Sequence, residues 1–294
     1  MASSEDPYYY RIYFSESNNH TGDADRQYVI KAAEAQSSEL NHSRMVWLTT
    51  RSATAQKALA NSALQNHQQQ GTINGKDIII FHLGKGVAPT QAMVDALKAV
   101  TKVTDVRKGF EFFSLIELDQ HVGFIRDNGL GLISYDLENG ASPSAEVNDP
   151  VSSFQQARAI TNREALDLVA APSNAISSGQ YAGDIAQLVN SYHLQSQPLQ
   201  TGDSTCNTMK NWVEDRVSVL ESANSNLKGR ITFQVTLTGN IAPGDPDAFI
   251  TAKRCIDAIL PGDVDGVTIF WNGATWDNGK YEKLLRYVED TYSP

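Results

Sequence analysis

Short apolar runs, rich in β-branched and aromatic residues, alternate along the chain with segments of helical period. Several of these runs are apolar nearly throughout, which is typical of parallel strands covered on both faces. The regular alternation of strand and helix predicts an α/β fold built on a parallel sheet. Nine strands are predicted, over residues 9–14, 45–49, 77–83, 112–118, 131–138, 166–171, 192–197, 231–237 and 267–271.

The fold that this alternation favours is a (β/α)8 TIM barrel, with residues 1–294 as a single domain. Such barrels commonly need ~250 residues. They close with eight strands, so one of the first two runs (9–14 or 45–49) is expected to be peripheral, or one strand prediction is wrong. A doubly wound open sheet is the alternative, but no glycine-rich phosphate loop follows the first strands. Two helix starts are marked by a capping aspartate before a proline, Asp149-Pro150 and Asp245-Pro246.

The run 131–138 carries the most informative chemistry. Side chains alternate along a strand, so Ser134, Asp136 and Glu138 share one face, and the apolar residues between them share the other. The two acids are then expected to point into the barrel at its carboxyl end, where barrel enzymes build their sites. Neighbouring carboxylates can hold different protonation states, which suits acid–base catalysis. The alternative is a polar cluster in which each acid is satisfied by a basic or amide partner.

The same run resembles the fourth-strand motif D-x-x-D-x-D-x-E of glycoside hydrolase family 18, the chitinases and their relatives. Asp136 and Glu138 match the last two acids, whereas Gly131 and Ser134 stand where the family has the first two. Three later runs are similar to strands five, six and eight of that family, over residues 166–173, 192–197 and 266–271. Four strands in the right order carry the resemblance, which covers roughly residues 129–290.

The resemblance implies a glycosidase that acts on glycans containing N-acetylglucosamine. Glu138 would be the general acid that protonates the glycosidic oxygen. Asp136 would orient the 2-acetamido group, whose carbonyl oxygen attacks the anomeric carbon in a substrate-assisted route. Trp271 would stack under the sugar, although a tryptophan in a strand more often packs in a core. Gln197 stands where the family has a tyrosine against the acetamido carbonyl, so either the substrate has changed or the barrel has become a binder.

Further polar residues are expected around the same mouth. Gln195 and Gln197 share one strand face, and Gln234 belongs to the next strand. Amides suit sugar hydroxyls, although each single glutamine is equally explained as barrel filling. Glu117 is expected at the end of the preceding strand, as a third carboxylate. No pair of histidines has the spacing of a zinc site, so no metal and no cofactor is expected, with carboxylates alone left as an alternative.

Composition and charge narrow the partners. The chain has 24 Lys and Arg against 34 Asp and Glu, a net charge of −10 without a dense basic run. This disfavours nucleic acid and anionic membranes, and no apolar run reaches membrane-spanning length. Cys206 and Cys255 have no metal-ligand spacing, and Cys255 is predicted to be a packed thiol. The abundance of Asn, Gln, Ser and Thr slightly favours an extracellular location, but the sequence leaves the compartment and the oligomeric state open.

Three hypotheses follow for the function. The first is a glycosidase with Glu138 as its acid. The second is a non-catalytic carbohydrate-binding barrel, which the loss of acids at Gly131 and Ser134 favours. The third is a barrel hydrolase of another class that uses Asp136, Glu138 and Glu117. Retention of both Asp136 and Glu138 puts the glycosidase first, because a binder has no need of a proton donor.

Overall fold

The described part of the chain forms one parallel β-sheet with helices packed outside it. The structure, a computed structural model, describes residues 9–14, 45–48, 78–83, 85–100, 107–200, 205–236, 248–262 and 264–271, together with Leu284, Tyr287 and Thr291. The strands are β1 (Tyr9–Phe14), β2 (Met45–Leu48), β3 (Ile78–His82), β4 (Arg107–Phe112), β5 (Leu132–Tyr135), β6 (Asp167–Ala170), β7 (Ser191–Leu194), β8 (Ile231–Thr236) and β9 (Gly266–Trp271).

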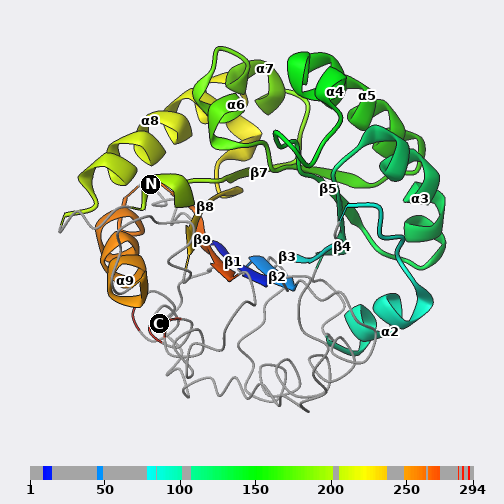
Figure 1. Cartoon of the computed structure of the whole chain (residues 1–294), viewed down its shortest axis with the longest axis horizontal. Helices are drawn as coiled ribbons and strands as arrows, with labels where there is room; N and C mark the ends of the chain where they lie inside the picture. The colour runs from blue at the N-terminus through cyan, green and yellow to red at the C-terminus, as the bar shows by residue number, and fades with distance from the viewer. Residues whose placement is uncertain are drawn as a thin grey trace, which may run out of the picture.

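The sheet curls in the manner of a TIM barrel (Figure 1). Its strand order is β1-β9-β8-β7-β6-β5-β4-β3-β2, neighbouring strands in this order run parallel, and the two end strands β1 and β2 lie side by side. Neighbours in the sheet are therefore neighbours in sequence, apart from β1, and the described strands show no reversal of order of the kind that marks a doubly wound sheet. The described residues contain nine strands, one more than the expected barrel, and both of the first two belong to the sheet.

The helices lie around the outside of the curled sheet (Figure 1). They are α2 (Gln91–Val100), α3 (Leu115–Asp127), α4 (Ser144–Asn148), α5 (Pro150–Arg163), α6 (Asn174–Ser178), α7 (Ala182–Ala186), α8 (Asn207–Ala223) and α9 (Ala248–Ile259), with two 3-10 turns, η1 (Gln197–Leu199) and η2 (Ser225–Leu227). Asp149 caps α5 as predicted, by accepting a hydrogen bond from the Ser152 amide, whereas Asp245 lies outside the described residues. Within the described ranges, none of the helices has the length and apolar character of a membrane span.

The two faces of the sheet differ in chemistry. Alternate strand residues such as Phe110, Tyr135 and Phe233 pack outward against the helices and form the main hydrophobic core. The residues between them face inward, and many of these are buried and polar. They include Glu111, Ser134, His193, Thr232, Gln234 and Thr268. The inward face of the curled sheet is therefore lined by hydrogen-bonding groups.

The strand predicted over residues 112–118 is wrong, and the predicted position of Glu117 is wrong with it. The strand expected over 112–118 ends at Phe112, and α3 begins three residues later. Ser114 is its N-cap and accepts a hydrogen bond from the Glu117 amide, while the Ser114 hydroxyl donates to the Glu117 carboxylate. Ser114 and Glu117 have the S-x-x-E spacing of a capping box, which is the signal in the sequence for this helix start. Glu117 therefore lies in the first turn of a helix, not at a strand end.

Replacement of Ser114 by alanine is expected to lower the free energy of unfolding by about 1 kcal/mol, because the Glu117 amide then loses its capping acceptor. Urea titration of Ser114→Ala and of the parent measures the difference. Ser178→Ala, a serine near the end of a helix that bonds only the Asn174 carbonyl and Trp212, is a suitable control. Equal losses in the two variants would contradict the capping role.

The prediction that Cys255 is a packed thiol is also wrong. Cys206, directly before α8, and Cys255, on α9, form a disulfide with their Cα atoms 5.2 Å apart. Cys255 does lie on the buried face of its helix, as expected. The two cysteines are 49 residues apart in sequence, and only the packing of α8 beside α9 brings them together.

Candidate functional site

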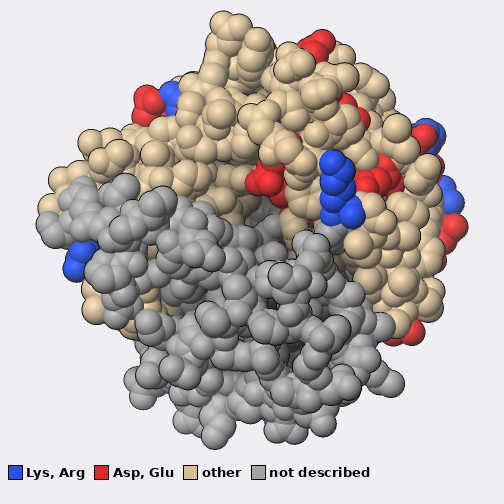
Figure 2. Space-filling view, viewed as in Figure 1, with Lys and Arg blue, Asp and Glu red and all other residues tan. Residues whose placement is uncertain are grey.

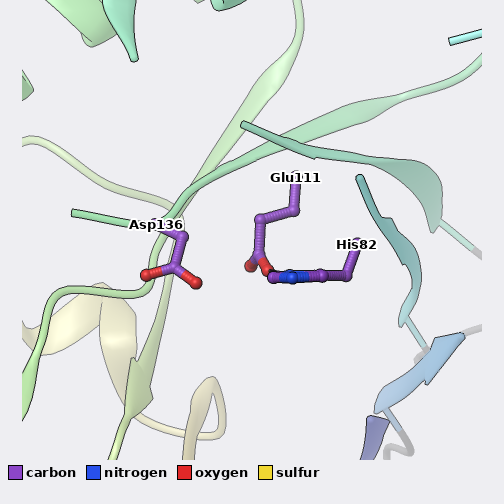
Figure 3. A group of neighbouring side chains, drawn as sticks. All are labelled: His82, Glu111 and Asp136. Atoms are coloured by element: carbon purple, nitrogen blue, oxygen red, sulfur yellow. Dashed lines mark hydrogen bonds and ion pairs between the residues drawn. The ribbon is translucent and has the colours of Figure 1, made fainter. Parts of the chain in front are cut away.

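A cluster of ionisable side chains lies at the carboxyl ends of β3, β4 and β5. His82 is the last residue of β3, Glu111 is near the end of β4, and Asp136 follows β5 directly. Figure 3 shows the three side chains converging from their separate strands. They are 6%, 0% and 3% exposed, so the cluster is almost completely removed from solvent. The strand register places His82 opposite Glu111, and Glu111 opposite Ser134.

Glu111 is the central member of the cluster. One of its carboxylate oxygens contacts His82 Nδ1, and the other accepts a hydrogen bond from the Ser134 hydroxyl at 2.8 Å. The His82 ring stands edge-on to Phe113, with ring centroids 5.0 Å apart, which fixes its orientation. Ser134 therefore serves as a donor to an acid of the neighbouring strand.

Asp136 is held by an amide from across the sheet. Gln195 follows β7, and its Nε2 donates to Asp136 Oδ1 and to the Ala171 carbonyl, both at 2.9 Å. The backbone amide of Asp136 donates to the Phe112 carbonyl at 2.9 Å, so the β4–β5 pairing extends to this residue. Both the backbone and the side chain of Asp136 are thus fixed before any ligand arrives.

Glu138 lies two residues further, just before a turn at residues 139–141, so it is not on the strand predicted over 131–138. The Ser142 hydroxyl accepts from the Glu138 amide at 2.9 Å and donates to the Asp136 carbonyl at 3.0 Å, which clamps the turn after the acid strand. Burial raises the pKa of the Glu138 carboxyl above its usual value. The nearby His82 and a hydrogen bond with Gln195 oppose this rise, and the Glu111 carboxylate adds to it. Glu138 therefore favours its protonated form more than a solvent-exposed glutamate does.

The other predicted site residues are distributed more widely. Gln234 is buried in β8 and pairs with His193 at 2.8 Å, deep among the inward-facing residues. Gln197 is not on a strand but in η1, where its side-chain oxygen is buried without a hydrogen-bond partner. Glu117 accepts from the Gly86 amide at 2.7 Å and from Ser114. The side chain of Trp271 lies outside the described residues, so its predicted role stays a prediction.

Sequence reasoning missed Glu111 as the acid that faces Asp136. The mistaken strand over 112–118 had assigned this place to Glu117. A shift of that strand to 107–112, which the capping box at Ser114 would have required, puts Glu111 on the inward face. The strand predicted over residues 77–83 contains His82, but no spacing in the sequence relates this histidine to the two acids.

The cluster offers two kinds of chemistry. Glu138 can act as a proton donor beside the fixed carboxylate of Asp136. His82, Glu111 and Asp136 each offer one ligand atom for a metal ion, and these atoms all lie within 4.8 Å of one another. Figure 2 shows Asp and Glu side chains near the centre of the viewed face, with Lys or Arg side chains beside them.

The fold has counterparts among solved chitinases of glycoside hydrolase family 18. One from Pseudoalteromonas aurantia matches with a TM-score of 0.54 and 12% identity, over 83% of this chain and 98% of that chain. One from Flavobacterium johnsoniae matches with a TM-score of 0.51 and 10% identity, over 83% of this chain and 92% of that chain. One from Crocus vernus matches with a TM-score of 0.50 and 13% identity, over 74% of this chain and 90% of that chain. No protein-family model and no curated protein sequence matches the chain. The chain therefore has an α/β, TIM-barrel-like fold similar to that of the family 18 chitinases.

Proposed function

We propose that the chain is a glycoside hydrolase that acts on glycans containing N-acetylglucosamine, with Glu138 as its general acid. The observation that carries this proposal is the pair formed by Asp136, fixed by Gln195, and Glu138, clamped through Ser142 at the carboxyl end of β5. Catalytic groups of barrel enzymes lie at this end of the strands. The likeness of the fold to family 18 chitinases supports the choice of glycan.

In the proposed reaction, Glu138 gives its proton to the glycosidic oxygen as the bond to the anomeric carbon breaks. The acetamido carbonyl of the substrate supplies the attacking oxygen, so no protein nucleophile is required. Asp136 orients the acetamido N–H, and its bond from Gln195 keeps the carboxylate in one position. Glu111 brings a carboxylate to the cluster from the neighbouring strand, β4. The family motif has two further acids on the β5 segment, and this chain has Gly131 and Ser134 at those positions. Gln197, with its unpartnered buried oxygen, and Trp271 are proposed to contact the sugar.

The test is the cleavage of chito-oligosaccharides, followed by chromatography, with the parent and with Glu138→Gln. Turnover is expected to fall by about 100-fold or more, because general acid catalysis contributes about 10²- to 10⁴-fold. Glu214→Gln is the matched control, since Glu214 is on the outer helix α8 and pairs with Lys210. Binding of the oligosaccharide by Glu138→Gln, measured by calorimetry, should persist.

Three results would count against the proposal. Equal turnover by the parent and Glu138→Gln would remove Glu138 from its role. Binding without cleavage by the parent would support a non-catalytic carbohydrate-binding barrel. A parent that neither binds nor cleaves chito-oligosaccharides would remove this substrate class, and a wider glycan panel would then test the third hypothesis.

We also propose that residues 1–294 act as one domain in an extracytoplasmic compartment. The Cys206–Cys255 disulfide supports this location, because disulfides persist in oxidising compartments and are rare in the cytosol.

A further inference from the structure

Three ligand-type side chains reach one point from three consecutive strands of the sheet. We propose that His82, Glu111 and Asp136 bind one divalent transition-metal ion, of which zinc is the type. This inference goes beyond the proposed glycan chemistry, does not require it, and shares only Asp136 with it. Figure 3 shows the His82 imidazole meeting the Glu111 carboxylate, with one oxygen of Asp136 directed toward them.

The distances fit a shared ion. Zinc bonds to imidazole nitrogen and carboxylate oxygen are about 2.0–2.2 Å long, so two ligands on one ion lie at most about 4.4 Å apart. The ligand atoms of His82, Glu111 and Asp136 all lie within 4.8 Å of one another, close to this limit. A bound ion would replace the direct contact between His82 and Glu111.

The ligands also have the supporting hydrogen bonds of a built site. Ser134 donates to one oxygen of Glu111, and Gln195 donates to one oxygen of Asp136, so each carboxylate is held in place by a neighbour outside the three ligands. The edge-on contact with Phe113 holds the His82 ring. Outer contacts of this kind orient ligands and typically change metal affinity by about 10- to 100-fold when removed.

The donor set indicates the class of ion. One imidazole with two carboxylates is typical of zinc, iron or manganese, whereas magnesium and calcium are bound through oxygen alone. Two carboxylates in a nearly dry site are stabilised by a cation more strongly than they would be at the surface. Three protein ligands leave a fourth position for water.

The experiment uses the full, untagged chain after treatment with a chelator. Calorimetric titration with zinc should give one ion per chain. His82→Gln and Glu111→Gln should each weaken binding by at least about tenfold, since loss of a ligand exceeds the effect of an outer contact. His121→Gln is the matched control. His121 stacks on Phe112 with ring centroids 5.9 Å apart, outside the cluster, and its loss should leave zinc affinity unchanged.

Two further measurements protect the test against misfolding. Ser134→Ala keeps all three ligands and should weaken zinc binding by about tenfold while circular dichroism stays that of the parent. Cobalt should give a visible absorption band in the parent and in His121→Gln but not in His82→Gln. Absence of zinc binding by the folded parent, or equal binding by His82→Gln and His121→Gln, would overturn the proposal.

Glu138→Gln separates this proposal from the proposed function. It keeps the three metal ligands and removes the proposed acid, so it should retain zinc while losing turnover. Turnover by a parent that binds no zinc would overturn the metal site alone. Zinc binding by a parent without turnover would overturn the glycosidase alone.

Discussion

Replacement of both Cys206 and Cys255 by serine is expected to lower the free energy of unfolding by about 4 kcal/mol. The disulfide joins residues 49 positions apart, and a cross-link closing a loop of that length restricts the unfolded chain by about this amount in the chain-entropy model. The two side chains are 3% and 0% exposed, so their hydroxyl replacements also enter a buried setting. Cys206 has a backbone φ of 51°, an unfavourable conformation for a residue with a side chain, and the cross-link to α9 helps to hold it there.

Urea unfolding with and without a reducing agent measures this effect. The parent should lose stability when reduced, and the double variant should be insensitive to the reductant. A thiol assay on the unreduced, unfolded parent should find none of the two cysteines free. A parent whose unfolding midpoint does not respond to reduction would mean that the bond between α8 and α9 contributes nothing to stability.

Replacement of Gly109 by alanine is expected to cost about 3 kcal/mol, the upper end of the usual range for overpacking. A Cβ atom at this position would lie 1.8 Å from the backbone oxygen of Leu132 and 2.6 Å from its Cδ1. Gly109 and Leu132 are paired in β4 and β5, so the clash cannot be relieved by a side-chain rotation alone. The two strands must separate, and these are the strands that carry Glu111 and Asp136.

Gly131→Ala is the matched control for this substitution. Gly131 precedes β5 and is exposed, and a Cβ atom added there would meet no other atom within 4 Å. The stability of this variant should stay within about 1 kcal/mol of the parent. Thermal and urea unfolding of both variants give the comparison. Similar stabilities for Gly109→Ala and Gly131→Ala would show that the close approach of β4 and β5 is not required.

Local pattern was sufficient for much of the fold. The apolar runs predicted strands that the structure contains at 9–14 and 231–236, because alternation and burial on both faces are recorded in a few consecutive residues. The acid strand is present too, but it covers Leu132–Tyr135 and stops before Asp136 and Glu138. The helix start at Pro150 was equally local, since a cap depends on its own neighbours. The strand predicted over 112–118 was wrong because it, too, was predicted from local pattern alone. The true strand, Arg107–Phe112, is polar over much of its length, and the apolar residues after it belong to α3.

The sequence by itself determined that strands and helices alternate and that two acids, Asp136 and Glu138, come soon after the apolar residues of one strand, β5. These properties depend on residues close together in the chain. The tertiary structure alone decided that Glu111 and His82 join Asp136, that Gln195 holds it, and that Cys206 reaches Cys255. These partners are 25 to 59 residues apart, and no local spacing relates them. Strand register brings the site residues together, because the carboxyl ends of parallel strands in a curled sheet all lie on the same side of the molecule. The packing of α8 beside α9 brings the two cysteines together.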